Sequence, residues 1–199
     1  MGRRNRGEKY WAGYLFADGS FEYNLKQGRN PQVRLTSIDK EHIRKFINFA
    51  GATTSIYQVN NSSNSVVWTT KFTDKKLFNF CDNHGIVSKI QVSPYLYNSR
   101  HFWRGVIDGD GYIGTKNDKR DNGRPRGRIC LTNNSPIILI QFKNFASPVL
   151  DNCSLLKQNN CYSIGTSSYK TEDLVEKLYK KSKIHLNRKK IIANKIVTL

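Results

Sequence analysis

The sequence WAGYLFADG occupies residues 11–19, and the related sequence WRGVIDGDG occupies residues 103–111. In both, small residues recur four positions apart: Gly13 and Ala17, then Gly105 and Gly109. Residues with this spacing share one helix face, and a face of small residues lets two helix backbones approach closely. The segments therefore predict two helices packed side by side, drawn from points almost half of the 199-residue chain apart.

Each segment ends on an acid followed by glycine: Asp18 before Gly19, and Asp110 before Gly111. The glycines suit the left-handed residue that often closes a helix. The acids would lie in the last helical turn, where the helix dipole disfavours an anion by roughly 0.3 to 1 kcal/mol. Two carboxylates at one end of a helix pair repel each other unless a cation neutralises them. Asp-Gly is also a common hairpin turn, but duplication with matching flanks favours a two-fold metal site.

The chain is strongly basic, because 33 Lys and Arg against 15 Asp and Glu give a net charge of +18. At this size such a charge indicates a polyanionic partner such as nucleic acid. No apolar run approaches the roughly 18 residues of a membrane span, and residues 1–6 lack the apolar stretch of a secretion signal. We therefore expect a soluble, intracellular protein with no membrane partner. The scattered cysteines disfavour zinc and are expected to be free thiols.

The pattern after residues 11–19 repeats after residues 103–111. In the first half, alternating polar and apolar residues predict strands over 21–25, 32–36, 55–59 and 66–72, and capped helices over 40–50 and 74–84. In the second half, the same signals predict strands over 112–116, 127–132, 155–158 and 162–165, and helices over 136–147 and 172–181. Each half thus has the order helix, two strands, helix, two strands, helix. A last helix over 187–197 has no counterpart.

The two nonapeptides, with this repeat order, resemble the LAGLIDADG family of homing endonucleases in its single-chain, two-repeat form. The resemblance covers nearly the whole chain. It implies an α+β fold of pseudo-two-fold tandem αββαββα repeats, over residues 1–94 and 95–199. In that fold, two antiparallel four-stranded sheets form a saddle that binds double-stranded DNA, and one monomer carries both halves.

The eighth residue of each motif is the family's metal-binding acid, which the resemblance places at Asp18 and Asp110. The motif's first Asp is retained as Asp108 but is Phe16 in the first repeat; it is not the family's metal ligand. Trp11 and Trp103 replace Leu. They suit a helix base packed into each domain, where each indole N–H needs a partner.

The family also places a basic residue near each scissile phosphate. The matching positions are Lys89 and Lys189, with Arg188 as a competitor for the second. Residues 188–190 could instead be a charge run that is solvated or contacts DNA phosphates. Ser37 and Asn133 occupy comparable places for the polar residue that completes the family's site.

Hydrolysis of a phosphodiester needs charge neutralisation and an activated water, and a divalent metal supplies both. Asp18 and Asp110 offer the hard oxygen ligands that suit Mg²⁺, and we expect Mn²⁺ to substitute for it. With one acid for each DNA strand, a double-strand break follows from the symmetry. Together with these residues, the resemblance implies a magnesium-dependent, site-specific DNA endonuclease with a long asymmetric target.

DNA recognition is expected on the solvent faces of the strands, because one face of each sheet buries its apolar residues. Arg can pair with guanine, and Asn or Gln with adenine, in the major groove, while other contacts reach only phosphates. The candidate DNA-binding residues are Asn24, Lys26, Gln32, Arg34, Lys116, Arg124, Arg126, Arg128 and Thr132.

Two other functions fit the same fold. An intron maturase would bind intron RNA and assist splicing without the metal acids, and a regulator would bind DNA without cleaving it. Retention of both Asp18 and Asp110 favours the nuclease and leaves a dual role with RNA open.

Overall fold

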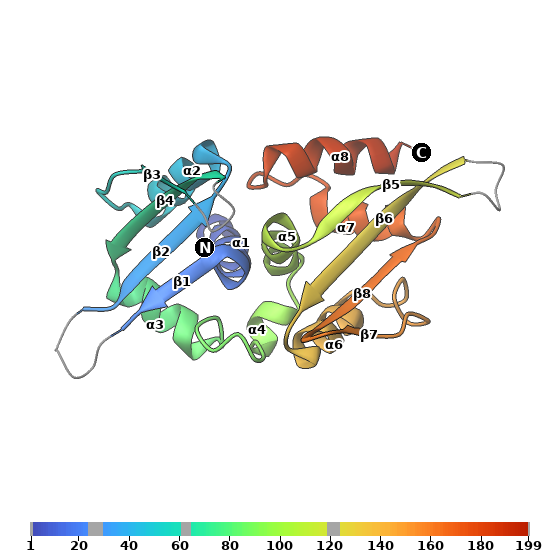
Figure 1. Cartoon of the computed structure of the whole chain (residues 1–199), viewed down its shortest axis with the longest axis horizontal. Coiled ribbons are helices and arrows are strands. Elements are labelled where there is room, and N and C mark those ends of the chain that lie inside the picture. The colour runs from blue at the N-terminus through green and yellow to red at the C-terminus, as the bar shows by residue number, and fades with distance from the viewer. Residues whose placement is uncertain (1, 24–29, 61–64, 119–123, 199) are drawn as a thin grey trace.

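The computed structural model describes residues 2–23, 30–60, 65–118 and 124–198. Two four-stranded antiparallel sheets lie on either side of a central pair of helices, and further helices cover one face of each sheet (Figure 1). The predicted α+β fold with pseudo-two-fold repeats is confirmed. None of the helices in the described part of the chain combines the length and apolar character that a bilayer span needs.

The first sheet takes all its strands from the first half of the chain, in the order β1-β2-β4-β3. Its strand β2 alternates buried and part-exposed side chains, as the sequence pattern predicts for a sheet covered on one face. The elements of this half are α1 (Gly2–Asp18), β1 (Gly19–Glu22), β2 (Gln32–Ser37), α2 (Lys40–Ala50), β3 (Tyr57–Asn60), β4 (Val66–Thr73) and α3 (Lys75–Asn83).

The second sheet has the same order, β5-β6-β8-β7. The last helix, α8, lies beside the second sheet and extends toward the first half (Figure 1). A short helix, α4, for which the sequence pattern gives no prediction, lies at the boundary between the two halves. The elements are α4 (Pro94–Tyr97), α5 (Arg100–Gly109), β5 (Tyr112–Asp118), β6 (Arg124–Asn133), α6 (Pro136–Phe145), β7 (Leu156–Gln158), β8 (Cys161–Ser167), α7 (Thr171–Tyr179) and α8 (Asn187–Val197).

The central helices α1 and α5 contact each other through their backbones at two glycines. A Cβ placed on Gly13 would lie 2.0 Å from the carbonyl oxygen of Phe102, and one on Gly105 would lie 2.1 Å from that of Tyr10. Neither distance leaves room for a side chain. The prediction that small residues let these helices approach closely is confirmed, and the contact is nearly symmetric.

The glycines after the acids serve a different purpose from the predicted one. Neither Gly19 nor Gly111 has a positive φ, so neither closes its helix in the left-handed conformation. A Cβ on Gly19 would instead lie 2.4 Å from the carbonyl oxygen of Leu15, and one on Gly111 would lie 2.5 Å from Cδ1 of Ile107. Both glycines are needed because the chain turns back closely over the last turn of each motif helix.

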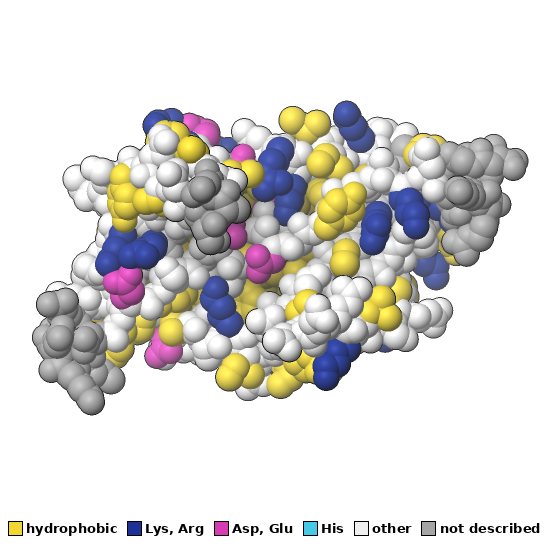
Figure 2. Space-filling view, in the orientation of Figure 1, with side chains coloured by type: hydrophobic (Ala, Val, Ile, Leu, Met, Phe, Trp, Pro, Cys, Tyr) yellow, Lys and Arg dark blue, Asp and Glu magenta, His cyan; other side chains and the backbone are white. Residues whose placement is uncertain are grey.

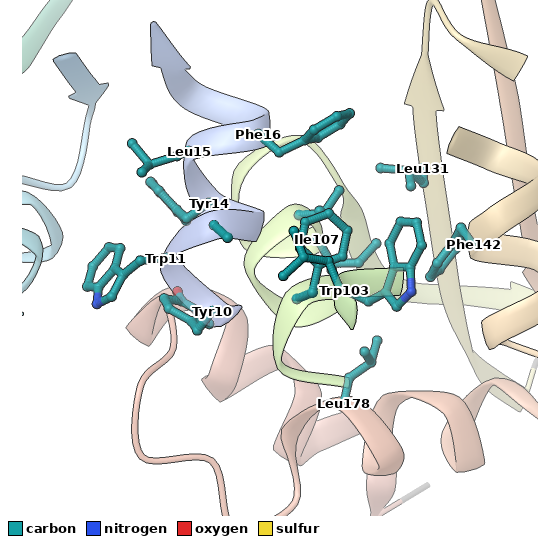
Figure 3. Close-up of a cluster of buried hydrophobic side chains, with 14 of the residues drawn as sticks. Tyr10, Trp11, Tyr14, Leu15, Phe16, Trp103, Ile107, Leu131, Phe142 and Leu178 are labelled. Atoms are coloured by element: carbon teal, nitrogen blue, oxygen red, sulfur yellow. The ribbon is translucent and has the colours of Figure 1, made fainter. Parts of the chain in front are cut away.

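The two motif tryptophans anchor α1 and α5 in opposite domains (Figure 3). Trp11 packs against Phe46 with ring centroids 5.1 Å apart, and Trp103 packs against Phe142 at 5.0 Å. The indole of Trp103 donates to the carbonyl oxygen of Tyr97 at 2.7 Å, as expected. The expectation is wrong for Trp11, whose buried Nε1 has no hydrogen-bond partner among the described residues.

Two helix starts also differ from the predicted ones. The helix predicted over 74–84 begins one residue later, because its N-cap is Asp74, whose carboxylate accepts a hydrogen bond from the Leu77 backbone at 2.9 Å. Helix α7 begins at Thr171 itself, whose hydroxyl accepts from the Ser168 backbone at 3.1 Å. The start of each helix is thus displaced by one residue from the predicted one.

Candidate active site

The two motif acids meet at the same end of the central helix pair. Asp18 is the last residue of α1, and Asp110 follows directly after α5. A Cβ on Gly109 would lie 3.4 Å from Oδ2 of Asp18, so this carboxylate reaches across to the end of α5. Figure 2 shows acidic side chains near the centre of the face between the two sheets, with Lys and Arg side chains around them.

The surroundings of both carboxyl groups raise their pKa values and so disfavour the ionised form. Burial, and after it the charge of Asp110, raises the pKa of Asp18 to about 6. Burial also raises the pKa of Asp110, while Lys89 and Lys189 oppose that rise. A cation bound between the two acids would relieve both the desolvation and the repulsion.

Lys89 places its ammonium group at the end of α1. Its Nζ donates to the carbonyl oxygens of Gly19 at 2.9 Å and Ala17 at 3.4 Å. Carbonyls at the end of a helix lack intrahelical partners and attract a cation. Lys89 itself has a φ of 55°, in the left-handed region, within the turn that follows α3. Burial lowers the pKa of its ammonium, and the charges of Asp110 and Asp18 oppose that change.

Lys189 does the same at the end of α5. Its Nζ donates to the carbonyl oxygens of Gly111 at 2.6 Å and Gly109 at 3.5 Å, which are equivalent to those that Lys89 contacts, and also to that of Ile107. Burial lowers the pKa of this ammonium to about 8, against the charge of Asp108. The competitor Arg188 instead donates through Nε to Asp39 at 3.1 Å. The structure therefore brings Lys189, and not Arg188, to the acids.

The donors at this site suit a small hard cation. Among the described residues, no three His, Cys, Asp or Glu side chains gather into a ligand set. Mg²⁺ typically binds one or two carboxylates and completes its shell with waters and substrate phosphates. The close pair of Asp18 and Asp110, whose pKa values are raised chiefly by burial, fits that mode of binding.

The open face of the first sheet carries a group of three charged residues. Glu22 lies between Arg34, 2.7 Å from its carboxylate, and Lys71, 2.6 Å from it. Arg34 and Lys71 are directly opposite each other on β2 and β4. We call Glu22, Arg34 and Lys71 the charged triplet. It fixes a guanidinium and an ammonium on the face where DNA contact is predicted.

The open face of the second sheet has a hollow at the equivalent place. Counted along the strands from Gly19 and Gly111, the positions of the charged triplet correspond to Gly114, Cys130 and Gly165. A shallow depression of about 370 Å³ lies here, lined among others by Lys116, Arg128, Cys130, Thr132 and Gly165. The two half-surfaces therefore offer different chemistry at matching positions.

The predicted sheet faces agree with the structure. The side chains expected inside, Val33, Leu35, Ile129 and Leu131, are all buried. Six of the candidate DNA-binding residues lie on the opposite, open faces of their strands: Gln32, Arg34, Lys116, Arg126, Arg128 and Thr132. Asn24 and Lys26 lie outside the described residues, and so does the side chain of Arg124. Direct contact of these residues with DNA stays a prediction.

Ser37 and Asn133 occupy matching positions at the ends of β2 and β6. The hydroxyl of Ser37 accepts from the backbone of Asp39 at 3.2 Å, and Oδ1 of Asn133 accepts from that of Ser135 at 2.9 Å. Both side chains thus stabilise the turn into the next helix. The Ser37 hydroxyl also lies 3.1 Å from that of Tyr14, one turn before Asp18.

Comparison with known proteins shows the fold. No protein-family model and no curated protein matches the sequence. Among solved structures, that of the homing endonuclease I-WcaI bound to its DNA recognition sequence superimposes with a TM-score of 0.65 and 14% identity, over 95% of this chain and 86% of that one. This chain has the LAGLIDADG homing endonuclease fold.

Two further structures with the LAGLIDADG fold agree. The meganuclease I-AabMI bound to uncleaved DNA has a TM-score of 0.60 at 12% identity, over 96% of this chain and 89% of that one. Mesophilic variants of the homing endonuclease I-DmoI give 0.60 at 14% identity, over 90% and 98%. The resemblance predicted from the two motifs is confirmed for the fold.

The sequence did not identify two features of this LAGLIDADG fold. The first is the part of Glu22 and Lys71 in the charged triplet. The alternation of residues along β4 could have placed Lys71 on the open face. The other is Asp108, which is fully buried and accepts three hydrogen bonds. Its equivalent, Phe16, is also buried, with its ring centroid 6.1 Å from that of Phe102.

Proposed function

We propose that this protein is a site-specific endonuclease that makes a double-strand break in DNA with the help of Mg²⁺. The observation that carries the proposal is the pair of equivalent acid and lysine sites at adjacent helix ends. The two acids, Asp18 and Asp110, and the two lysines, Lys89 and Lys189, which contact equivalent helix-end carbonyls, give one acid and one lysine for each strand of a duplex. The single chain holds both sets, so a monomer suffices.

The open faces of both sheets support binding to double-stranded DNA. They present Gln32, Arg34, Lys71, Lys116, Arg126, Arg128 and Thr132 on either side of the acids. The net charge of +18 favours a polyanion. The I-WcaI and I-AabMI structures with the same fold are complexes with DNA.

The unequal faces favour an asymmetric target. The charged triplet offers a fixed guanidinium, which suits a guanine edge, whereas the three equivalent positions on the second sheet, Gly114, Cys130 and Gly165, carry no charged side chain. Two half-sites read by such different surfaces would differ in sequence.

In the reaction, Asp18 and Asp110 would hold a divalent cation through their carboxylates. The cation supplies charge neutralisation at the phosphate and a more acidic water. Lys89 and Lys189, anchored on the last carbonyls of the motif helices, can stabilise negative charge that develops on the phosphate oxygens. Because these anchors fix the ammonium groups before DNA binds, little reorganisation is needed.

The test is incubation of the protein with Mg²⁺ and a randomised double-stranded DNA library, followed by sequencing of the cut ends. We expect defined cut sites with the wild type, and loss of cleavage in Asp18→Asn and Asp110→Asn with DNA binding retained. Asp151→Asn is the control, since Asp151 is exposed and, among the side-chain hydrogen bonds of the described residues, its carboxylate accepts only from the Ser147 hydroxyl at 3.1 Å.

Full cleavage by either active-site variant, or equal cleavage in excess chelator, would contradict the metal assignment. An intact library combined with tight binding of intron RNA would replace the endonuclease by the maturase function. Binding of defined DNA sites without cleavage would favour the regulator.

A further inference from the structure

Asp108 is the most deeply placed charged group near the active site. Its side chain is fully buried on α5, two residues before Asp110. A buried carboxylate is costly unless hydrogen bonds satisfy it. Asp108 accepts one from the Tyr10 hydroxyl at 2.7 Å, one from the Tyr179 hydroxyl at 2.6 Å and one from the Leu186 backbone N–H at 2.8 Å.

These donors come from three different elements. Tyr10 lies on α1, Tyr179 is the last residue of α7, and Leu186 is the residue directly before α8. The Tyr10 hydroxyl gives its one proton to Asp108, so it accepts from Nε2 of His42 at 2.9 Å, which extends the network into α2. A single carboxylate thus ties the start of α8 to both halves of the molecule.

The start of α8 needs such support because its charges oppose the helix dipole. Its first turn contains Arg188 and Lys189 and no acid, and its N-cap side chain makes no capping hydrogen bond. Cations at the positive end of a helix are disfavoured. The carboxylate of Asp108 supplies the missing negative charge at the backbone N–H of Leu186, three residues before Lys189.

The first half positions its lysine without this device. Phe16 occupies the place of Asp108, and Lys89 is held by a turn in which its N–H donates to the Gly85 carbonyl at 3.2 Å, with positive φ at both residues. The two ammonium groups reach equivalent carbonyls, but only Lys189 depends on a helix that must begin at a fixed point.

We infer that Asp108 is a positioning residue for Lys189, which it serves by fixing the first turn of α8 against the end of α5. The inference rests on the proposed endonuclease function. It predicts a defect confined to one active site, and therefore to one strand of the DNA target.

The test uses a supercoiled plasmid that carries a site selected from the randomised library. In Asp108→Asn the amide keeps the shape, and the Tyr179 hydroxyl can turn to accept from it, so the fold is retained while the charge is lost. We expect the strand served by Lys189 to be cut about tenfold more slowly, with the other strand within about twofold of the wild type, so that nicked circles accumulate. Phe16→Leu, at the equivalent place, is the control and should show no strand bias.

A double-mutant cycle with Lys189→Met separates positioning from general destabilisation. If Asp108 acts through Lys189, adding Asp108→Asn to Lys189→Met should cost little further rate on the affected strand. Equal slowing of both strands, an unchanged rate or additive losses would each overturn the inference.

A readout without cleavage keeps the two proposals distinct. Amide hydrogen exchange at Leu186 and Lys190, whose N–H groups donate to Asp108 and to the Leu186 carbonyl, should be faster in Asp108→Asn. Exchange at Lys89 is the internal control. Unchanged exchange at all these amides would overturn the positioning role. A wild type that cleaves no DNA would refute the endonuclease, and the exchange result would still decide the role of Asp108.

Discussion

Lys89 and Lys189 reach equivalent carbonyl oxygens from unlike kinds of structure. Lys89 sits in a turn with a φ of 55°, whereas Lys189 lies in the first turn of a helix held by the buried Asp108. The carbonyls themselves, at the ends of α1 and α5, are fixed by the glycine contacts between the two helices. The symmetry is therefore kept at the positions of the reactive groups and not in the elements that deliver them.

The central helix pair is nearly symmetric, whereas the two sheets are not. At the axis, the tryptophan contacts repeat closely, with Trp11 to Phe49 at 6.2 Å and 34° and Trp103 to Phe145 at 6.1 Å and 33°. On the open faces, the charged triplet of the first sheet and the hollow of the second lie at equivalent positions but differ in their side chains. Equal chemistry on two strands needs equal geometry, while an asymmetric target needs unequal surfaces.

The largest expected effect follows from breaking the symmetric helix contact. Gly13→Ala and Gly105→Ala each place a methyl group about 2 Å from a backbone oxygen, so the helices must separate. We expect each to lower the free energy of unfolding by about 3 kcal/mol, at the upper end for overpacking, and to do so nearly equally. Urea denaturation measures this.

The matched control for this pair is Gly51→Ala. Gly51 also requires glycine, with a φ of 65° at the end of α2, but a Cβ there would meet nothing within 4 Å. Its loss should be about 1 kcal/mol, the cost of the left-handed conformation alone. Clearly unequal losses at Gly13 and Gly105 would show that the axis is less symmetric than its contacts indicate.

The packing of α1 against α5 could be predicted from sequence, because the residues that indicate it lie close together within each helix. The spacing of Gly13 and Ala17, and the acids that end both motifs, depend on neighbours within one helix. The charged triplet could not, since it needs the register among β1, β2 and β4, whose connections vary in length. The role of Asp108 likewise depends on Leu186, which only the tertiary fold brings near. Gly19 was misassigned because glycine signals both positive φ and close approach, and the sequence does not separate them.

A second prediction is that the ionised carboxylates of Asp18 and Asp110 lower the stability of the folded protein. The pKa of Asp18 is raised from 3.8 to about 6. Between these values the folded protein keeps a proton that the unfolded chain releases, so stability falls as pH rises through this window and the cost persists above it. Without divalent cation at pH 7, Asp18→Asn should therefore be more stable than the wild type by about 1 to 3 kcal/mol.

This gain should shrink toward zero at pH 4 and should be reversed by Mg²⁺, which stabilises only the wild type. Asp110→Asn should shift stability in the same direction by less, because the side chain of Asp110 is more solvent-accessible than that of Asp18 and its carboxylate is desolvated less. Thermal unfolding at several pH values measures both. A wild type that is the more stable protein at pH 7 would refute the idea that burial, together with the charge of Asp110, makes the ionised Asp18 carboxylate costly.

The smallest expected effect concerns the unequal sheets. In Glu22→Gln the side chain keeps its size, but Arg34 and Lys71 lose the carboxylate that fixes them. Freed cations can contact phosphates, which adds affinity without sequence information. Among library sites cut by this variant, we expect several-fold weaker base preference in the half-site under the first sheet and no change in the other. Glu41→Gln is the matched control, since Glu41 pairs with Arg44 on α2, which covers the buried face of the sheet. If the base preference weakened equally in both half-sites, the altered net charge, and not the charged triplet, would account for the change. The difference between the two sheets would then have no role in recognition.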